Sequence, residues 1–484
     1  MNPLFLKLKN IAAFEWAIFF LMALWTALTF SIALTEITFV CALICWVGWH
    51  IQQKKGICQN APAGGKIDWA FWMPLALFFV CVLSSFFTSE YPKQSLRGLY
   101  KIAKPLLAFI MAIDLFRDTR SQKRFDGIFL ATFLLVTIDC SIQYAFGKDI
   151  LRGFAAEQSA AGIRLIGPFG NFAKMATYLV LVIPVFGMRF WSDYTRSEQR
   201  KRSFYSLALA IAGLVLLYLT RCRGPVVALA FSFGILFIYK RWFKVVGIAL
   251  LLGLALLAVV PRGVIIHANK DSREQSFVER LCLWQRAFDV IKAKPLTGTG
   301  INTYDKAHAK YDTQQRKNLA SLRGPTTSVR QEQNGSVSFI TGETIYTSDV
   351  KQTNIRLGDK KYNLFRDAKG EYYIYDTLLV RGYYAHNGYL QLAAEIGLPG
   401  IFCFLWFLFM FFRKVLGGLG AIRGSPEEYT RLGILTGLLA FLIYAIGDNN
   451  LQSPPSLMFF WFSAGILMAR QSAAPSEIIS SKKP

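Results

Sequence analysis

His386 is the residue of this chain best placed to do proton chemistry. It follows a polar stretch, roughly residues 261 to 385, and lies in the sequence Y-Y-A-H-N-G-Y-L-Q (383–391), after which the chain becomes apolar again. A neutral imidazole is the natural base at physiological pH. A lone histidine is usually structural, so it is the position at the end of the polar stretch that makes His386 a catalytic candidate.

Arginines near two short segments could bind an anion. Arg221 and Arg223 lie in T-R-C-R-G-P (220–225), a tight connection between two apolar segments, and Arg280 lies one helical turn before Trp284. Backbone amides at the start of the helix after Arg223 would add positive potential, and several guanidinium groups can neutralise a diphosphate leaving group without a metal. Two alternatives stay open, because Arg221 and Arg223 could bind lipid headgroups by snorkelling, and Arg280 could merely face solvent.

A third segment, R-L-I-G-P-F-G-N (164–171), has the glycines and proline of a turn. Its backbone amides, Arg164 and Asn171 suit recognition of a phosphate or a sugar, although the segment could equally be a plain turn. No His-Glu-x-x-His, Asp-x-Asp or Cys-x-x-Cys motif occurs in the chain. We therefore predict neither a metal site nor a cofactor.

The composition predicts the kind of scaffold that must position these residues. The chain of 484 residues is 54% hydrophobic and 17% charged, more apolar sequence than one soluble core could use. We predict an all-α polytopic membrane protein with about twelve transmembrane helices, each about 17–22 apolar residues long. The predicted spans are 11–27, 30–49, 68–87, 99–116, 126–145, 171–191, 204–220, 224–241, 243–260, 397–413, 431–447 and 455–470.

Basic residues follow every even-numbered span, which predicts the orientation of the chain. By the positive-inside rule both termini are cytoplasmic, and the long loop lies on the outer face, which is the periplasm for a bacterial inner membrane. The net charge of +24 is largely this bias plus a preference for anionic membrane lipids. Because the basic residues form no single patch, we predict no nucleic-acid partner.

The predicted domains follow from these spans. Residues 1–260 hold spans 1–9, residues 261–385 form a periplasmic loop domain, and residues 386–470 hold an interfacial helix and spans 10–12, before a cytoplasmic tail at 471–484. Within the loop, 263–323 has helical spacing and 325–380 has the pattern of a small β insert. The strands are expected at S-V-S-F-I-T, E-T-I-Y-T-S, Y-N-L-F and E-Y-Y-I-Y-D.

Taken together, the motifs resemble the O-antigen ligase and polymerase superfamily of GT-C-like membrane glycosyltransferases. The chain departs from the family pattern in having Cys222 where serine is usual and in the strand-rich insert before His386. The matching segments, in the family's order, are R-L-x-G-P-F-G-N (164–171), R-C-R-G (221–224) against Ser-Arg-Gly, Arg280 with Trp284 against R-x-x-x-W, P-L-x-G-x-G (295–300), and H-N-G-Y-L-Q (386–391) through E-I-G (395–397).

The resemblance implies a metal-independent transfer of a polysaccharide from undecaprenyl diphosphate, with inversion, on the periplasmic side. His386 would take the proton from the acceptor hydroxyl, and arginines would hold the donor diphosphate. In that scheme the diphosphate is bound by Arg223, Arg280 and Arg221, and further substrate contacts come from Arg164, Asn171, Trp284, Asn387 and Tyr389.

The acceptor separates three related functions. It is the lipid A-core for an O-antigen ligase, another lipid-linked repeat for a polymerase, and a pilin hydroxyl for a protein O-oligosaccharyltransferase. The single large loop before the tenth span favours the ligase in lipopolysaccharide biosynthesis, and outer basic residues suit the phosphates of lipid A. A transporter of lipid-linked glycans is less favoured, because the chain lacks internal symmetry and paired mid-span breaks. A headgroup-binding scaffold predicts that replacing His386 changes nothing.

Overall fold

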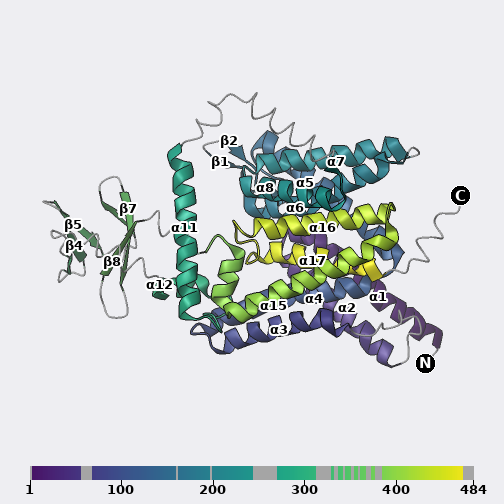
Figure 1. Cartoon of the computed structure of the whole chain (residues 1–484), viewed down its shortest axis with the longest axis horizontal. Coiled ribbons are helices and arrows are strands. Elements are labelled where there is room, and N and C mark those ends of the chain that lie inside the picture. The colour runs from purple at the N-terminus through teal and green to yellow at the C-terminus, as the bar shows by residue number, and fades with distance from the viewer. Residues whose placement is uncertain are drawn as a thin grey trace. The chain divides into compact units, whose positions relative to one another are not determined.

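The fold is largely helical (Figure 1), as a computed structural model of the chain shows. The structure describes residues 3–55, 68–159, 162–196, 199–243, 270–311 and 384–472, together with six strands between 329 and 376. The helices are α1 (Pro3–Phe30), α2 (Ile32–Lys54), α3 (Trp69–Phe87), α4 (Pro92–Leu115), α5 (Thr119–Phe146), α6 (Phe172–Tyr194), α7 (Arg200–Leu219), α8 (Arg223–Tyr239), α11 (Lys270–Ala293), α12 (Tyr304–Tyr311), α15 (Gly388–Leu419), α16 (Pro426–Tyr444) and α17 (Pro454–Ser472).

The predicted fold class is confirmed. Helices occur at eleven of the twelve predicted spans, and the ninth, 243–260, lies outside the described residues except for Phe243. Among the described helices, seven are long and apolar enough to cross a membrane, namely those within α1, α2, α3, α5, α6, α7 and α15. Helix α8 is apolar but shorter, and α4, α16 and α17 each bury a charged side chain, respectively Lys104, Arg431 and Arg470. The protein is therefore a multi-pass membrane protein.

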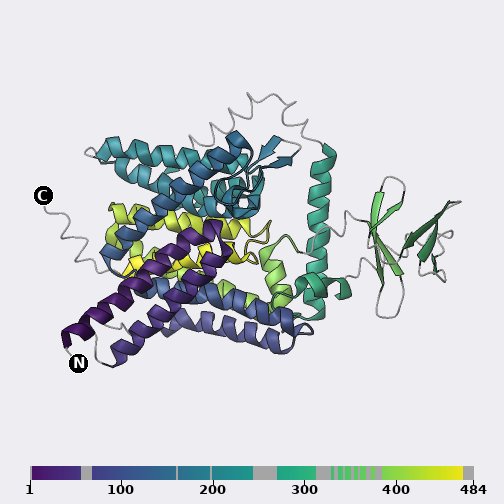
Figure 2. The ribbon, with the colours of Figure 1, turned by 180° about the vertical axis from the view of Figure 1, so that it is seen from behind.

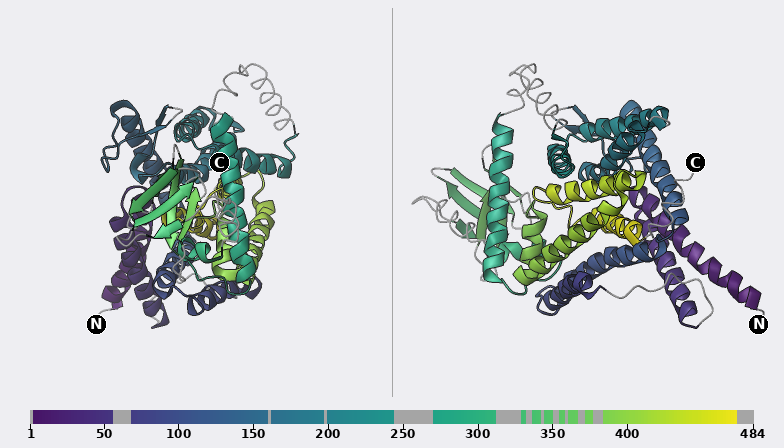
Figure 3. Two further views of the ribbon diagram at one scale, coloured as in Figure 1. Left: turned by 90° about the vertical axis from the view of Figure 1, so that its left-hand side faces the viewer. Right: turned by 45° about the vertical axis from the view of Figure 1, so that its right-hand side comes forward.

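Two small antiparallel sheets form the β insert (green in Figure 3). Strands β3 (Val329–Gln331), β4 (Ser336–Thr341) and β5 (Thr344–Asp349) make one sheet, and β6 (Asn354–Leu357), β7 (Lys360–Arg366) and β8 (Tyr372–Asp376) make the other. Neighbours in sequence are neighbours in each sheet, as short turns require. The sequence predicted β4, β5, β7 and β8, whereas the shorter β3 and β6 were missed.

The chain divides into two compact units, and each is built from separated segments. The first comprises Met1–Ala76, Tyr100–Pro261 and Phe404–Pro484, and the second comprises Leu77–Leu99 and Arg262–Cys403. The domain boundaries expected from the sequence, at 260 and 385, remain a prediction.

In the first unit, α6 packs against α7 and α16, and α16 also packs against α8. These helices run side by side in Figures 1 and 2, as do α1 and α2 near the N-terminus. Gly433 and Gly437 of α16 allow the close approach to α6, since a Cβ on Gly437 would lie 2.7 Å from the carbonyl oxygen of Leu181. This small-xxx-small spacing is the usual way for membrane helices to pack tightly.

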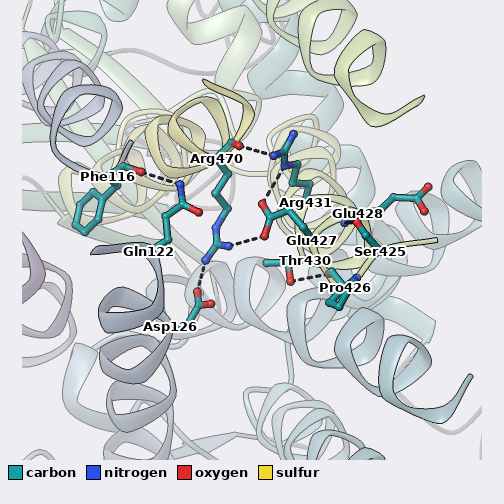
Figure 4. A network of polar contacts seen from close by, with 10 residues as sticks. All are labelled: Phe116, Gln122, Asp126, Ser425, Pro426, Glu427, Glu428, Thr430, Arg431 and Arg470. Carbon is teal, nitrogen blue, oxygen red and sulfur yellow. Dashed lines mark hydrogen bonds and ion pairs between the residues drawn. The ribbon is translucent and has the colours of Figure 1, made fainter. Parts of the chain in front are cut away.

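A buried ionic network joins α5, α16 and α17 of the same unit (Figure 4). Arg470 pairs with Asp126 and, at 3.0 Å, with Glu427, and Arg431 pairs with the same Glu427 at 2.9 Å. Arg431 also donates to the backbone carbonyl of Arg470. Both arginine side chains are only 3–4% exposed. Charged side chains that are buried this completely need partners. The network therefore fixes the three helices to one another.

Replacing Arg470 by methionine should destabilise the protein strongly. The change leaves Asp126 and Glu427 without their shared partner, and breaking a buried pair lowers the free energy of unfolding by up to about 3–5 kcal/mol. The matched control is Glu90→Gln, which breaks the exposed Lys310–Glu90 pair of 2.7 Å and should cost no more than about 1 kcal/mol. Thermal unfolding in detergent checks both variants, and equal midpoints would contradict a stabilising network.

Candidate functional site

His386 lies two residues before α15, in a backbone conformation that few residues adopt. Its φ is +47°, in the left-handed region, where side chains other than glycine are uncommon and where strain often accompanies function. Immediately afterwards, the Asn387 side chain caps the helix by accepting the N–H groups of Tyr389 and Leu390, both at 3.1 Å. The capping oxygen of Asn387 is thus used by the fold, and substrate binding by Asn387 and Tyr389 remains a prediction.

Trp284 of α11 contacts the His386 backbone. Its indole Nε1 lies 3.4 Å from the carbonyl oxygen of His386 and donates to it. Arg280 is exposed and lies on the same helix, and residues four apart on a helix are neighbours on its surface. The second unit therefore brings Trp284 and His386 into contact, and it holds Arg280 one helical turn before Trp284 on α11.

The segment P-L-T-G-T-G (295–300) is bonded directly to the start of α15. Three backbone hydrogen bonds join the two, from Thr299 N to Ala394 O at 3.0 Å, from Gly300 N to Glu395 O at 2.9 Å, and from Leu398 N to Pro295 O at 2.7 Å. We call this contact the backbone interlock. Two motifs that were recognised separately in the sequence are thus one structural element.

Glycines make the interlock possible. Gly397 interrupts α15 with φ +76° and ψ 172°, and a Cβ there would lie 2.2 Å from the carbonyl oxygen of Leu296. Gly298, at φ +66°, approaches the Glu395 backbone equally closely, since its Cβ would lie 2.3 Å from Glu395 C. Only glycine combines these conformations with such close backbone approach.

Tyr384, two residues before His386, was missed by the sequence analysis. Burial, together with the nearby carboxylates of Asp305 and Glu395, raises the pKa of the Tyr384 hydroxyl. A tyrosine hydroxyl is protonated at neutral pH, and the raised pKa acts in the same direction, so the group is able to donate a hydrogen bond. Its place within a run of tyrosines just before His386 is the signal that could have identified it.

The first unit contains the tight connection with Arg221 and Arg223. Arg221 has a left-handed φ of +55°, and its guanidinium Cζ lies 4.8 Å from the ring centroid of Tyr218. Arg223 is exposed and begins α8. Cys222 is the N-cap residue of α8 without a side-chain cap hydrogen bond, and the Thr220 hydroxyl accepts from the Cys222 N–H at 3.2 Å. An exposed arginine at an open helix N-terminus gives this end of α8 a positive potential.

Arg164 belongs to an ordered connection in the same unit. It ends the hairpin of β1 (Glu157–Ser159) and β2 (Gly162–Arg164), with its Nη1 3.8 Å from Glu157 and its Cζ 4.2 Å from the ring centroid of Phe172. Asn171 caps α6 by accepting from Ala173 N at 2.9 Å and Lys174 N at 3.1 Å. The predicted turn at 164–171 is therefore real, and Asn171 has a structural role in it. Its substrate contact remains a prediction.

Two observations place this connection beside the tight connection that contains Arg221 and Arg223. Leu165 N donates to Leu219 O at 3.0 Å, and a Cβ on Gly162 would lie 3.8 Å from Nη2 of Arg221. The structure thus places the Arg164 hairpin beside Arg221. Both guanidinium groups also have a buried Nε without a hydrogen-bond partner among the described residues, so their hydrogen-bonding capacity is not used up by the fold.

Asp448, after the end of α16, is a second residue that the sequence analysis missed. The Tyr444 hydroxyl donates a hydrogen bond to the Asp448 carboxylate. The Tyr444 ring packs on Gly224, since a Cβ on that glycine would lie 3.0 Å from Tyr444 Cε2. The signal in the sequence is an acidic residue in the short polar stretch between two apolar helices, where a charge needs a reason.

No cluster of three or more His, Cys, Asp or Glu side chains that could hold a metal ion occurs in the part of the chain that the structure describes. The expectation of metal-independent chemistry remains a prediction. It depends on the arginines, whose roles only substitution can test.

Residues 207–325 match a family model described as O-antigen ligase. The match contains Arg221, Arg223, Arg280 and Trp284, and it confirms the resemblance that the motifs predict. No curated protein matches the chain. The family match supports a ligase- or polymerase-type activity of a membrane glycosyltransferase, with lipid-linked polysaccharides as the class of substrate.

Replacing Gly397 by alanine should disrupt the interlock. The backbone conformation there is almost exclusive to glycine, and forcing alanine into it costs about 1–3 kcal/mol of stability. The added methyl group would also collide with the Leu296 carbonyl. The matched control is Gly417→Ala in the same helix, where a Cβ meets nothing within 4 Å and alanine is the better helix former. Thermal unfolding in detergent should show a lower midpoint for Gly397→Ala only. A normal midpoint for that variant would contradict the interlock.

Proposed function

We propose, from the match of residues 207–325 to the O-antigen ligase family model, that this membrane protein is an O-antigen ligase. It transfers a polysaccharide from undecaprenyl diphosphate to the lipid A-core on the periplasmic face of a bacterial inner membrane. In this orientation both termini lie in the cytoplasm and the segment before His386 lies outside. The donor, the acceptor and the side of the membrane are parts of the proposal.

The chemistry is a direct displacement at the anomeric carbon. His386 accepts the proton of the acceptor hydroxyl as the oxygen attacks, the bond from the anomeric carbon to the diphosphate oxygen breaks, and undecaprenyl diphosphate leaves with that electron pair. One displacement inverts the anomeric configuration. General-base catalysis of this kind contributes about 10²–10⁴-fold.

Arginines stabilise the negative charge that develops on the leaving group. A planar guanidinium binds two phosphate oxygens at once, which a lysine ammonium cannot do. We assign Arg223, Arg280 and Arg221 to the diphosphate and Arg164 to a further substrate contact. Arg223 and Arg280 are exposed and so are able to meet a ligand.

The backbone at His386 is the observation that supports His386 as the base. A left-handed histidine whose carbonyl is contacted by Trp284, and whose neighbour Asn387 caps α15, is held more tightly than a surface loop residue would be. A fixed backbone restricts the positions that the imidazole can reach, and such positioning supplies much of enzymatic rate enhancement. This supports a catalytic role over headgroup binding, for which the position of one histidine would not matter.

Replacing His386 by alanine should abolish transfer. Loss of the base lowers the turnover number by at least about 10²-fold, while membrane insertion and the unfolding midpoint stay near normal. The assay measures glycan transfer to lipid A-core by protein purified into liposomes, in the presence of EDTA. The control is His308→Ala, which removes another histidine from the same unit. Normal transfer by His386→Ala would favour the scaffold alternative.

Arg223→Lys should also impair transfer, although the charge is kept. Losing one of two parallel hydrogen bonds to a charged group lowers the rate by about tenfold or more. Arg413→Lys is the matched control, because Arg413 is an exposed residue of α15 with no assigned role. The same liposome assay measures both, and near-normal transfer by Arg223→Lys would count against a diphosphate clamp.

A further inference from the structure

We propose that Glu395 and Gln391 are positioning residues for transfer, acting as a buried carboxylate–amide pair that fixes the backbone leading into His386. This inference rests on the proposed function of His386. It names two residues that touch neither the reacting atoms nor the diphosphate in the scheme above. Both lie on α15, one helical turn apart, and both are 2% exposed.

The Glu395 carboxylate is enclosed by donors from another segment. Its Oε2 accepts from Asn302 N at 2.7 Å, and its Oε1 accepts from Tyr304 N at 3.4 Å, where α12 begins. Asn302 has a left-handed φ of +62°, which is uncommon for a residue other than glycine. A buried carboxylate is stable only with such partners, so Glu395 ties the segment before α12 firmly to α15.

Gln391 links Glu395 to the residue just before His386. Its Nε2 donates to Glu395 Oε1 at 3.1 Å, and its Oε1 accepts from Ala385 N at 3.4 Å. An ionised carboxylate can only accept hydrogen bonds. Glu395 therefore dictates which end of the Gln391 amide faces it, and the amide oxygen is left facing the Ala385 N–H.

The consequence is a backbone held on both sides of the histidine. Gln391 binds the N–H of Ala385, Trp284 binds the carbonyl of His386, and Asn387 caps the helix that follows. The left-handed conformation of His386 needs such support, because it is a strained state that persists only where the surroundings fix it. By fixing this backbone, Glu395 and Gln391 restrict the positions that the His386 imidazole can occupy.

Gln391→Met tests the pair with little change in volume. Methionine fills the same space but can neither donate to Glu395 nor accept from Ala385. We expect the turnover number to fall by about 10- to 100-fold, as for a small misplacement of a catalytic group, with the KM for the donor little changed. Gln391→Glu should be worse than Gln391→Met, because it places a second carboxylate beside Glu395.

The matched control is Gln285→Met. Gln285 lies on α11 in the same unit and donates to Asp289 at 3.2 Å, but it makes no hydrogen bond to the 385–391 segment among those described here. Its turnover number should stay near that of the unmodified protein. Equal losses in the Gln391 and Gln285 variants would show a general effect on folding and would overturn the proposal.

A second measurement does not depend on transfer. Diethylpyrocarbonate modifies histidines at rates that report their surroundings, and peptide mass spectrometry resolves His386 from His308. We expect the His386 rate, relative to that of His308, to change severalfold in Gln391→Met but not in Gln285→Met. An unchanged relative rate in Gln391→Met would overturn the proposal. If the rate changes but His386→Ala still transfers glycan normally, the positioning holds and the proposed function of His386 fails.

Discussion

The backbone interlock between 295–300 and 394–398 is the constraint on which the His386 region depends. Three hydrogen bonds between main-chain groups fix the first turns of α15 against a loop, and glycines at positive φ allow the two backbones to meet. The buried Glu395 then extends the contact to the start of α12. Because His386 lies only two residues before the same helix, its backbone position follows from contacts that involve no substrate.

The arginines of the first unit have two kinds of surroundings. The arginines of the α5–α16–α17 network are buried and paired, so they stabilise the packing of helices. Arg223 is exposed at the N-terminus of α8, and Arg221 and Arg164 keep a buried Nε without a partner among the described residues. The buried arginines of the network thus serve the fold, whereas Arg223 is exposed and Arg164, although it pairs with Glu157 at 3.8 Å, keeps one Nε that no described residue bonds.

Much of the fold and part of the site could be predicted from the sequence. Long apolar windows require helices in a membrane, and they located eleven described helices correctly. Strands β3 and β6, of three and four residues, are too short to show a recognisable alternation of polar and apolar residues. The motifs identified His386, Trp284 and Arg280 but not the contact of Trp284 with His386, because these two residues are 102 positions apart and leave no local signal. The backbone hydrogen bond of Thr299 with Ala394, 95 positions apart, was missed for the same reason. The positioning role proposed for Glu395 was missed for the same reason, since its donor Asn302 N is 93 residues away in the sequence. Tyr444 and Asp448 are only four residues apart, so their contact is local and was overlooked although Asp448 is an acidic residue beside an apolar helix.

The most direct test of the account offers two acceptors at once. Protein in liposomes would receive an undecaprenyl diphosphate-linked glycan, both as donor and as the acceptor for polymerisation, together with lipid A-core, and mass spectrometry would identify the products. We predict glycan joined to lipid A-core with inverted anomeric configuration. Lengthening of the undecaprenyl-linked glycan, with lipid A-core left unmodified, would contradict it.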